Sequence, residues 1–594
     1  MTNQAFTWLL RQRIAFDWYK FSAELLQTSF LCVLPLLFLV VTGHPQQSQP
    51  PNPASAGQTT TFKSEVRVVL IDVVVTDGKS KPVGGLQKKD FEVTEDDRPQ
   101  AISFFQEHTG GGISRIALPP SSPDVYTNYP RIKTTDSINV LLLDSLNTQA
   151  SDQTYLRPQM VKFLESALKT PTGARLAIFT LGQRLHIVRA FTDDYEALLT
   201  SLTDRKTGAD PKFQSQLASP SRKVTDSILC FGIRSPAGAD ACKEFVAEED
   251  ADRAADRVGM TLQAFQNLSR YLAQFPGRKN VMWVSGSFPV SFFPETNPKG
   301  IFRKEYQTDI RQTADLLTAD QVAVYPISAT GLAVDNAMSA DSYGQLLHDG
   351  SSNRDFEQIA METLARDTGG KAFYNTNGLS DAMTEAINDG SHYYTLTYTP
   401  TNAAMDGKYR RIGLKVANEN YKLAYRRGYY AEDTTTRLRT DRNAENDPLM
   451  PLVSFGMPDF AEILYKVRVA ALHDHSTDNR ANSSVRYGVD FAISPPDLKL
   501  KAGADAVRSG MIEVVLIAYD YEGKALKIIK QKLPVHIRPD VYQSLQRVGL
   551  QLHEEIDLPK GDVYLETGIY DLMASHAGTL GIPLTVTGTD EPSK

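Results

Sequence analysis

The amino-acid sequence predicts a multidomain protein: a doubly wound α/β unit inserted in one β-sandwich and followed by a second, all-β sandwich. Three observations lead to this prediction. The 594 residues are too many for one hydrophobic core, because a domain typically holds ~100–200 residues. Between residues 138 and 390, short apolar runs alternate with helix-like periodicities. On either side, β-branched and aromatic runs separated by turn residues indicate strands.

Two β-rich segments, residues 62–108 and residues 392–431, flank the α/β region. The first contains the β-branched run Val66–Val75, and the second begins with the aromatic run HYYTLTYT. Each is too small to be stable alone and would leave strand edges unpaired. We therefore predict that the two halves pair into one sandwich around the α/β unit. A stretch rich in glycine and proline, residues 110–130, is expected to be a linker.

The central segment, residues 138–390, is predicted to form a parallel sheet covered by helices. Its first strand, INVLLLD at residues 138–144, is a continuous apolar run, as expected of a strand buried on both faces. Apolar residues then recur at intervals of four from Leu156 to Leu168, which indicates a helix. Further strands are expected at residues 174–181, 280–284, 322–327 and 371–374. Helices are expected at residues 193–202, 310–319, 356–365 and 380–387, and a polar insertion at 203–250 is followed by a further helix that ends near Phe275.

The rest of the chain reads as a linker and a second β domain. Residues 432–448 are polar and are expected to form the linker. Residues 449–588 contain strand-like runs separated by turn residues, which is typical of an antiparallel sandwich. The clearest of these runs are residues 463–471, 485–493, 511–521 and 563–570.

The charge balance excludes one class of partner. The chain has 63 basic and 70 acidic side chains, a formal net charge of −7. Nucleic-acid binding requires a concentrated basic face, and the sequence shows none. We expect no nucleic-acid partner.

The N-terminus predicts export. Residues 30–41, FLCVLPLLFLVV, are too short for a bilayer span of ~20 residues and suit the core of a signal peptide. Residues 1–43 are therefore expected to be a signal peptide or an N-terminal anchor, and the proline-rich residues 44–61 a disordered tether. The protein would be periplasmic, secreted or at the cell surface, and would touch a membrane only if this segment is not cleaved.

The cysteine content agrees with an oxidising compartment. Cys32 lies in the leader, which leaves Cys230 and Cys242 in the remainder of the chain. Two cysteines at this spacing in an exported protein are expected to form a disulfide, with two free buried thiols as the alternative.

Three motifs, in this order, resemble a known family: IDVVVTDGKSKPVGGLQKKDFEVTEDDRPQAISFF from Ile71, VLLLDSLNT from Val140 and YKLAYRRGYYA from Tyr421. They are similar to the von Willebrand factor type A-related (VWA-related) family of acidobacterial type, over residues 62–431 and more loosely beyond. The resemblance implies a doubly wound, Rossmann-like α/β domain that recognises protein partners, often through a metal ion. It does not imply an enzyme.

In that family the metal site follows the first buried strand, with the pattern Asp-x-Ser-x-Ser completed by a distal Thr and a distal Asp. Here residues 144–148 read Asp-Ser-Leu-Asn-Thr, so Asp144 and Thr148 match and Leu146 does not. Thr192 is the candidate for the distal threonine. Serine and glycine stand where the distal aspartate is expected, at residues 285–287. The resemblance thus implies a degenerate site with one formal charge, which would hold Mg²⁺ or Mn²⁺ weakly.

Two interpretations of this motif stay open. In one, the degenerate site binds Mg²⁺ or Mn²⁺, with Asp152, Asp193 or Asp194 as further oxygen ligands. In the other, Asp144 caps the loop that follows it and no metal binds. No cofactor is certain from the sequence.

Enzyme chemistry has little support. Ser285 and Ser287 follow a buried strand, but the Gly-x-Ser-x-Gly elbow is absent and no base can be assigned to either serine. His473 and His475 could share a strand face and bind a transition metal, although no third ligand is evident. His553 lacks the second histidine of a zinc-protease helix. We expect a protein that is not an enzyme.

The function expected from the sequence is an exported protein-interaction module of adhesion type. Its unidentified protein partner would bind at the top of the α/β sheet, at Ser145, Asn147, Ser285, Ser287 and Phe288. The alternative is a structural component of an envelope assembly, in which the sandwiches form the interface and the α/β unit binds no metal. A weaker third hypothesis is a carbohydrate-binding surface on the C-terminal sandwich.

Overall fold

The computed structural model describes most of the chain beyond residue 67. The described residues are 68–109, 114–115, 124–130, 132–133, 138–148, 150–169, 174–203, 233, 235–287, 307–330, 351–374, 378–432, 447–472, 484–503 and 505–587. All of them belong to one compact unit, Val66–Lys594. The predicted leader and tether, residues 1–61, lie outside the described residues. None of the helices described here is long and apolar enough to cross a membrane.

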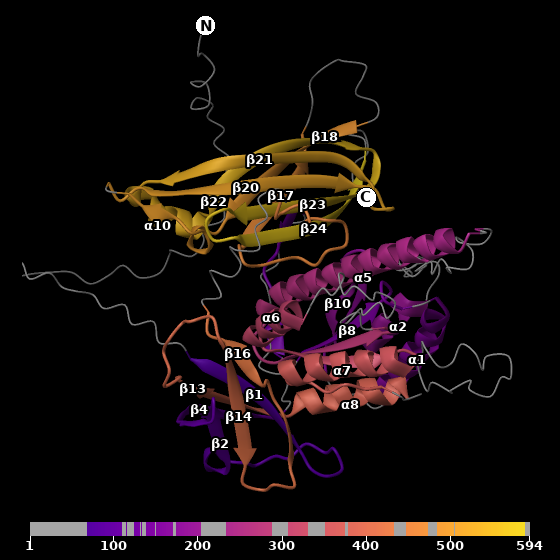
Figure 1. The fold of residues 1–594 in the computed structure, drawn as a ribbon. Coiled ribbons are helices and arrows are strands. Elements are labelled where there is room, and N and C mark those ends of the chain that lie inside the picture. The colour runs from indigo at the N-terminus through magenta and orange to yellow at the C-terminus, as the bar shows by residue number, and fades with distance from the viewer. Residues whose placement is uncertain are drawn as a thin grey trace, which may run out of the picture. The chain divides into compact units, whose positions relative to one another are not determined.

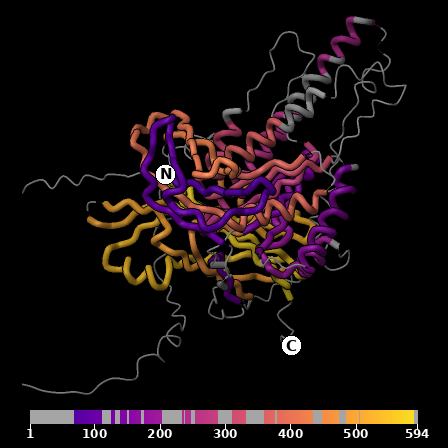
Figure 2. The backbone as a smooth tube through the Cα atoms, turned by 90° about the horizontal axis from the view of Figure 1, so that it is seen from below, coloured from indigo at the N-terminus to yellow at the C-terminus, as the bar shows by residue number. Residues whose placement is uncertain are grey.

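The N-terminal sandwich combines strands from both sides of the α/β region. In one sheet the antiparallel pairs are β1 with β13 and β15, and β13 with β4; in the other they are β14 with β16 and β2, and β2 with β3. In Figures 1 and 2 the indigo strands accordingly lie beside the orange ones. A tyrosine-rich core, which includes Tyr394 and Tyr398, joins the two sheets. The strands are β1 (Val69–Thr76), β2 (Phe91–Glu95), β3 (Arg98–Gln100), β4 (Ile102–His108), β13 (Tyr393–Tyr398), β14 (Tyr409–Val416), β15 (Lys422–Ala424) and β16 (Gly428–Tyr430).

The α/β region is built on a five-stranded sheet of order β10-β9-β8-β11-β12. Four strands are parallel, and β10 at one edge runs antiparallel to β9. Every residue of β8 is buried, which explains its unbroken apolar sequence. The strands are β8 (Ile138–Asp144), β9 (Leu176–Leu181), β10 (Leu185–Thr192), β11 (Lys279–Ser285) and β12 (Val322–Ser328).

Helices cover both faces of this sheet (Figure 1). Leu141 and Leu143 of β8 pack with α1, α2 and α8, whereas Val140 and Leu142 pack with α5, α6 and α7. The two-residue period of a strand accounts for this division. The helices are α1 (Ala150–Lys169), α2 (Tyr195–Thr203), α5 (Pro236–Ala273), α6 (Gln307–Ala319), α7 (Ser351–Thr368) and α8 (Leu379–Ser391).

The C-terminal sandwich has one sheet of order β22-β18-β17-β6 and one of order β19-β20-β23-β24, in which β21 also pairs with β20. Its core is aliphatic, with residues such as Val489 and Leu516 fully buried. The elements are β17 (Tyr465–Ala471), β18 (Ser484–Ile493), β19 (Lys501–Ala502), β20 (Arg508–Tyr519), β21 (Ala525–Ile537), α10 (Pro539–Val548), β22 (Leu550–Pro559), β23 (Gly561–Asp571) and β24 (His576–Val586).

The linker prediction for residues 110–130 is wrong for its second half. Residues 125–127 form β6 (Val125–Thr127), which pairs antiparallel with β17. The buried Asn128 side chain donates to the carbonyl oxygens of Phe460 and Ile463, both at 2.8 Å, and accepts from the Tyr465 amide. These bonds fix the segment to the C-terminal sandwich, although proline and glycine around it suggested a loop. Two short strands, β5 (Ser114–Arg115) and β7 (Ile132–Lys133), pair with each other.

Two further differences concern the α/β region. The strand expected at residues 371–374 is reduced to a single bridge between Phe373 and Ile327. Helix α5 begins at Pro236, inside the predicted polar insertion. Ser235 accepts a hydrogen bond from the Gly238 amide at 3.0 Å, and a proline opens the first turn, which together make a favourable helix start.

Candidate functional site

The candidate site lies where the parallel strands end. Strands β8, β11 and β12 reach the same edge at Asp144, Ser285 and Ser328, because parallel strands share their carboxyl ends. In doubly wound folds, ligands bind outside this edge.

The opposite, amino edge contacts the N-terminal sandwich: Gln321 donates to Asp72 at 3.0 Å, and the Arg278 amide donates to the Tyr393 hydroxyl at 3.2 Å.

Asp144 is the centre of the site and is almost completely buried. Its Oδ1 accepts from the Asn147 amide at 2.9 Å. Its Oδ2 accepts from Asn147 Nδ2 at 2.8 Å, Trp283 Nε1 at 3.0 Å and Ser285 Oγ at 2.8 Å. Four donors from two chain segments therefore converge on one carboxylate. Burial raises the pKa of Asp144 above its ordinary value, although these hydrogen bonds act in the opposite direction.

Around Asp144 the loop 144–148 is tied to the neighbouring strands. The Ser145 hydroxyl donates to the Leu181 carbonyl at 2.9 Å. The Gly286 amide donates to Thr148 Oγ1 at 2.8 Å. A Cβ on Gly286 would lie 3.1 Å from Thr148 Cα, so only glycine allows so close an approach without displacement. The loop and the end of β11 are thereby held together.

Some hydrogen-bonding capacity at this edge is unused. Asn147 Oδ1 and Gln153 Oε1 are buried and have no hydrogen-bond partner within the described part of the chain. A cavity of about 20 Å³ lies beside Asp144, Ser145 and Gln153. That volume has room for about one water molecule, and of the two residues with a free oxygen only Gln153 lines it.

The oxygens of the predicted metal site do not fit a divalent cation in this arrangement. Asp144 Oδ2 faces three hydrogen-bond donors, whose hydrogens point to where a cation would sit. Thr148 Oγ1 faces a further donor, and the Ser145 hydroxyl is directed at a carbonyl. Within the described residues no group of three His, Cys, Asp or Glu side chains is placed to hold a metal ion. The geometry matches the interpretation of Asp144 as a loop cap.

Thr192, the predicted distal ligand, is not part of this site. Because β10 runs antiparallel to β9, Thr192 pairs with Leu176, whereas Asp144 pairs with Leu181. Five residues along β9 separate these positions by about 16 Å. Thr192 Oγ1 instead accepts from the Asp194 amide at 3.0 Å, next to the start of α2. The direction of β10 relative to β9 produces this difference, and no sequence pattern indicates that direction.

The predicted partner-binding residues differ in their exposure to solvent. Ser145, Asn147 and Ser285 are buried and cannot touch a partner, which corrects their proposed role. Ser287 is partly exposed, and Phe288 lies outside the described residues. Other edge residues with exposed surface include Leu146, Asp152, Gly286, Ser328 and Thr330.

Three further sequence candidates have different outcomes. Cys242 is disulfide-bonded, and Cys230 lies outside the described residues. His473 and His475 also lie outside them. His553, on β22, pairs with Asp490 of β18 at 2.6 Å, which gives it a cross-strand role.

Sequence reasoning missed Trp283 and Thr261 as members of the site. Trp283 packs edge-on against Phe265 and directs its indole nitrogen to Asp144. Thr261 of α5 accepts from Asn147 Nδ2 at 3.0 Å. A tryptophan two residues before the end of a buried strand needs a partner for its nitrogen, and this was the one available signal.

Comparisons with known proteins assign no family. No protein-family model and no curated protein matches the sequence. An aerotolerance-related membrane protein from Bacteroides fragilis NCTC 9343 is similar at 12% identity, over 42% of this chain and 98% of that one, with a TM-score of 0.22. Proximal thread matrix protein 1 from the mussel byssus is similar at 11% identity, over 43% of this chain and 48% of that one, with a TM-score of 0.22.

The pilus adhesin SpaC from Lactobacillus rhamnosus GG is similar at 7% identity, over 80% of this chain and 56% of that one, with a TM-score of 0.23. This chain thus spans about half the length of the mussel protein and of the adhesin. TM-scores of this size carry no functional assignment.

Proposed function

We propose that this chain is an exported protein-binding module of VWA-like type, which recognises a protein partner at the carboxyl edge of its α/β sheet without a metal ion. The observation that carries the proposal is the arrangement of the two sheet edges. The amino edge is in contact with the N-terminal sandwich through Gln321 and Arg278. The carboxyl edge gathers the ends of four parallel strands and presents polar residues with exposed surface, including Ser287 and Thr330.

The Asp144 network supports binding by a rigid surface. Two chain segments, 144–148 and 283–287, are joined by hydrogen bonds at 2.8–3.0 Å, and further bonds at 2.6–2.9 Å lie within each segment. A surface held in this way loses little conformational entropy when a partner binds. We assign Asp144 to the maintenance of this surface and not to contact with the partner.

Binding fits this edge better than catalysis. Ser285 is completely buried, and its hydroxyl lies 2.8 Å from Asp144 Oδ2 and 2.6 Å from the Ser287 carbonyl, two acceptors that compete for its single proton. A nucleophile must reach its substrate, and this hydroxyl has no exposed surface. The partly exposed Ser287 has no assigned base.

Site-specific photo-crosslinking in producing cells tests the proposal. A photoreactive side chain at position 287 or 330 is expected to capture a discrete protein partner. The matched probe at Lys527, on the exposed strand β21, reports on the C-terminal sandwich. Capture at 527 alone would contradict the proposal and favour the alternative, in which the sandwiches form the interface of an envelope assembly.

A further inference from the structure

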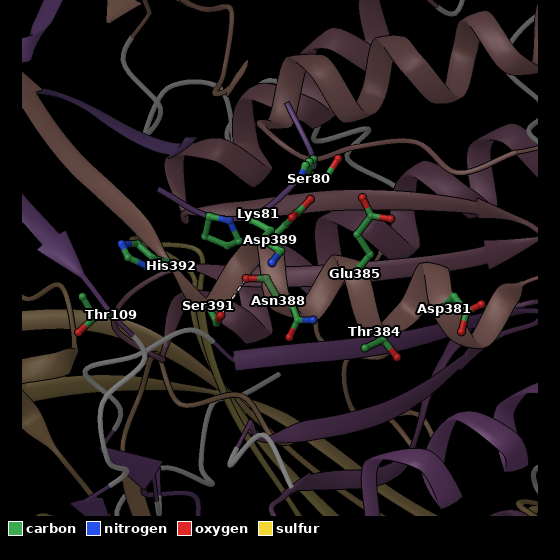
Figure 3. A pocket seen from close by; sticks show the side chains of 12 residues that line it. Ser80, Lys81, Thr109, Asp381, Thr384, Glu385, Asn388, Asp389, Ser391 and His392 are labelled. Carbon is green, nitrogen blue, oxygen red and sulfur yellow. Dashed lines mark hydrogen bonds between the residues drawn. The ribbon is translucent and has the colours of Figure 1, made fainter. Parts of the chain in front are cut away.

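A pocket of about 760 Å³ opens beside α8, on the side of the N-terminal sandwich. Figure 3 shows the residues that line it. Lys79 and Lys81 come from the turn after β1, and Glu385, Asn388 and Asp389 come from α8. The end of α8 lies against the start of β11, and the contact is so close that a Cβ on Gly390 would overlap the Asn280 side chain. The pocket is therefore at the amino edge of the sheet and distinct from the Asp144 site.

Asp389 is the unusual residue of this pocket. The residue is only 6% exposed, and its Oδ1 has no hydrogen-bond partner among the residues that the structure describes. No lysine, arginine or histidine nitrogen of the described chain pairs with it, although Lys79 and Lys81 are exposed residues of the same pocket. A buried carboxylate oxygen without a hydrogen-bond partner is unfavourable, and native structures satisfy such atoms with protein, water or ligand.

The acceptors around Asp389 favour a cation. Asp381, Glu385 and Asp389 are spaced by four residues and so lie along one face of α8. Glu385 is paired with Lys371, whose charge offsets only part of this acidic row. Burial, with a contribution from Glu385, raises the pKa of Asp389 to about 6, although Lys371 and Arg278 lower it. The charged residues that α8 contributes to the pocket are thus all acidic, whereas Lys79 and Lys81 come from the turn after β1.

The cation that fits is organic. A divalent metal ion needs several oxygen ligands, and within the described residues no cluster of three acidic, histidine or cysteine side chains is placed to hold one. An alkylammonium group has three donors and a single charge, and one buried carboxylate with neutral oxygens suffices for it. The neutral oxygens of Thr384, Asn388 and Ser391 line the same pocket.

We propose that this pocket binds a ligand with a protonated alkylamine, with the ammonium group against Asp389 and its carbon chain extending to the pocket mouth. A lysine side chain of a peptide and a free diamine carry the same chemistry. The volume of about 760 Å³ is in the range of small-molecule sites, and it accommodates either source. This inference is independent of the function proposed for the carboxyl edge.

Ligand-observed NMR titration of the purified full-length chain tests the inference. The probes are Nα-acetyl-lysine methylamide, 1,5-diaminopentane and the neutral Nα-acetyl-norleucine methylamide. We expect both amines to bind and the norleucine derivative not to bind. A preference for the lysine derivative would identify a peptide as the source, and a preference for the diamine a free polyamine.

Two variants complete the test. Asp389→Asn keeps the shape of the side chain and is expected to weaken amine binding at least about tenfold, because it removes a charge-assisted hydrogen bond. Glu419→Gln, at an exposed position outside the pocket, is the matched control and should leave binding unchanged. Failure of both amines to bind, binding of the norleucine derivative with equal affinity, or full binding by Asp389→Asn would each overturn the inference.

Discussion

Asp144→Asn is the sharpest perturbation of the carboxyl edge, because it changes one atom at the centre of the hydrogen-bond network. The carboxylate accepts four hydrogen bonds, three of them at Oδ2. An asparagine has one oxygen, so either orientation of its amide sets N–H groups against at least one donor. Loss of a buried acceptor costs ~1–3 kcal/mol, and relief of the buried charge offsets part of it. We expect the free energy of unfolding to fall by ~2 kcal/mol.

Tryptophan fluorescence during urea unfolding measures this loss locally. The chain has three tryptophans, and Trp8 and Trp18 lie in the predicted leader, so Trp283 is the single reporter once residues 1–43 are removed. Its indole nitrogen is bonded to Asp144. With a slope of ~2 kcal/mol per M, the midpoint should fall by ~1 M. Thr192→Val, two strands away and about 16 Å further along the strand direction, is the control and should lower the midpoint by less. An unchanged or higher midpoint for Asp144→Asn would refute the structural role.

Three further predictions follow from the same structure. Because Mn²⁺ quenches a nearby indole, its addition should leave Trp283 emission unchanged if Asp144 holds no metal; saturable quenching would show that it does. Asp389→Asn should stabilise the protein by ~1–2 kcal/mol at pH 7.5 and hardly at all near pH 4. The reason is that folding raises the pKa of Asp389 to about 6, so its carboxylate destabilises the folded state only at pH values above the pKa it has in the unfolded chain. Equal gains at both pH values in urea unfolding would contradict this. Gly286→Ala should cost ~1–3 kcal/mol in the Trp283-monitored transition, because its Cβ would crowd Thr148, and a neutral result would mean that the loop yields freely.

The sequence predicted the elements of the α/β region well, because a buried strand and an amphipathic helix each leave a strong periodic signal. The apolar run at residues 138–144 and the strand at 280–284 are both strands in the structure. The periodicity of apolar residues does not show in which direction a strand runs, so the antiparallel direction of β10 was not predicted. For the same reason, the prediction that Thr192 lies beside Asp144 was wrong. The prediction that the segments 62–108 and 392–431 pair rested on unpaired edges, and β1 does pair with β13.

Side-chain roles were harder to predict than strands. Asp144 was the right centre, but whether it held a metal or capped a loop depended on where the donors of Trp283 and Ser285 point, and spacing alone does not determine this. No sequence pattern indicated the pocket at Asp389. Three acidic residues spaced by four on a helix usually form a solvated face, and only tertiary burial distinguishes Asp389 from the other two.

The central claim is that the carboxyl edge of the sheet recognises a protein partner without a metal ion. The most direct test is photo-crosslinking through position 287, carried out on the same cells with a chelator and with added Mg²⁺. We expect one discrete partner, captured with equal yield under both conditions. Capture that needs Mg²⁺ would contradict the proposal that partner binding is independent of metal. Capture through position 527 without any capture through position 287 or 330 would contradict the proposal that the partner binds at the carboxyl edge.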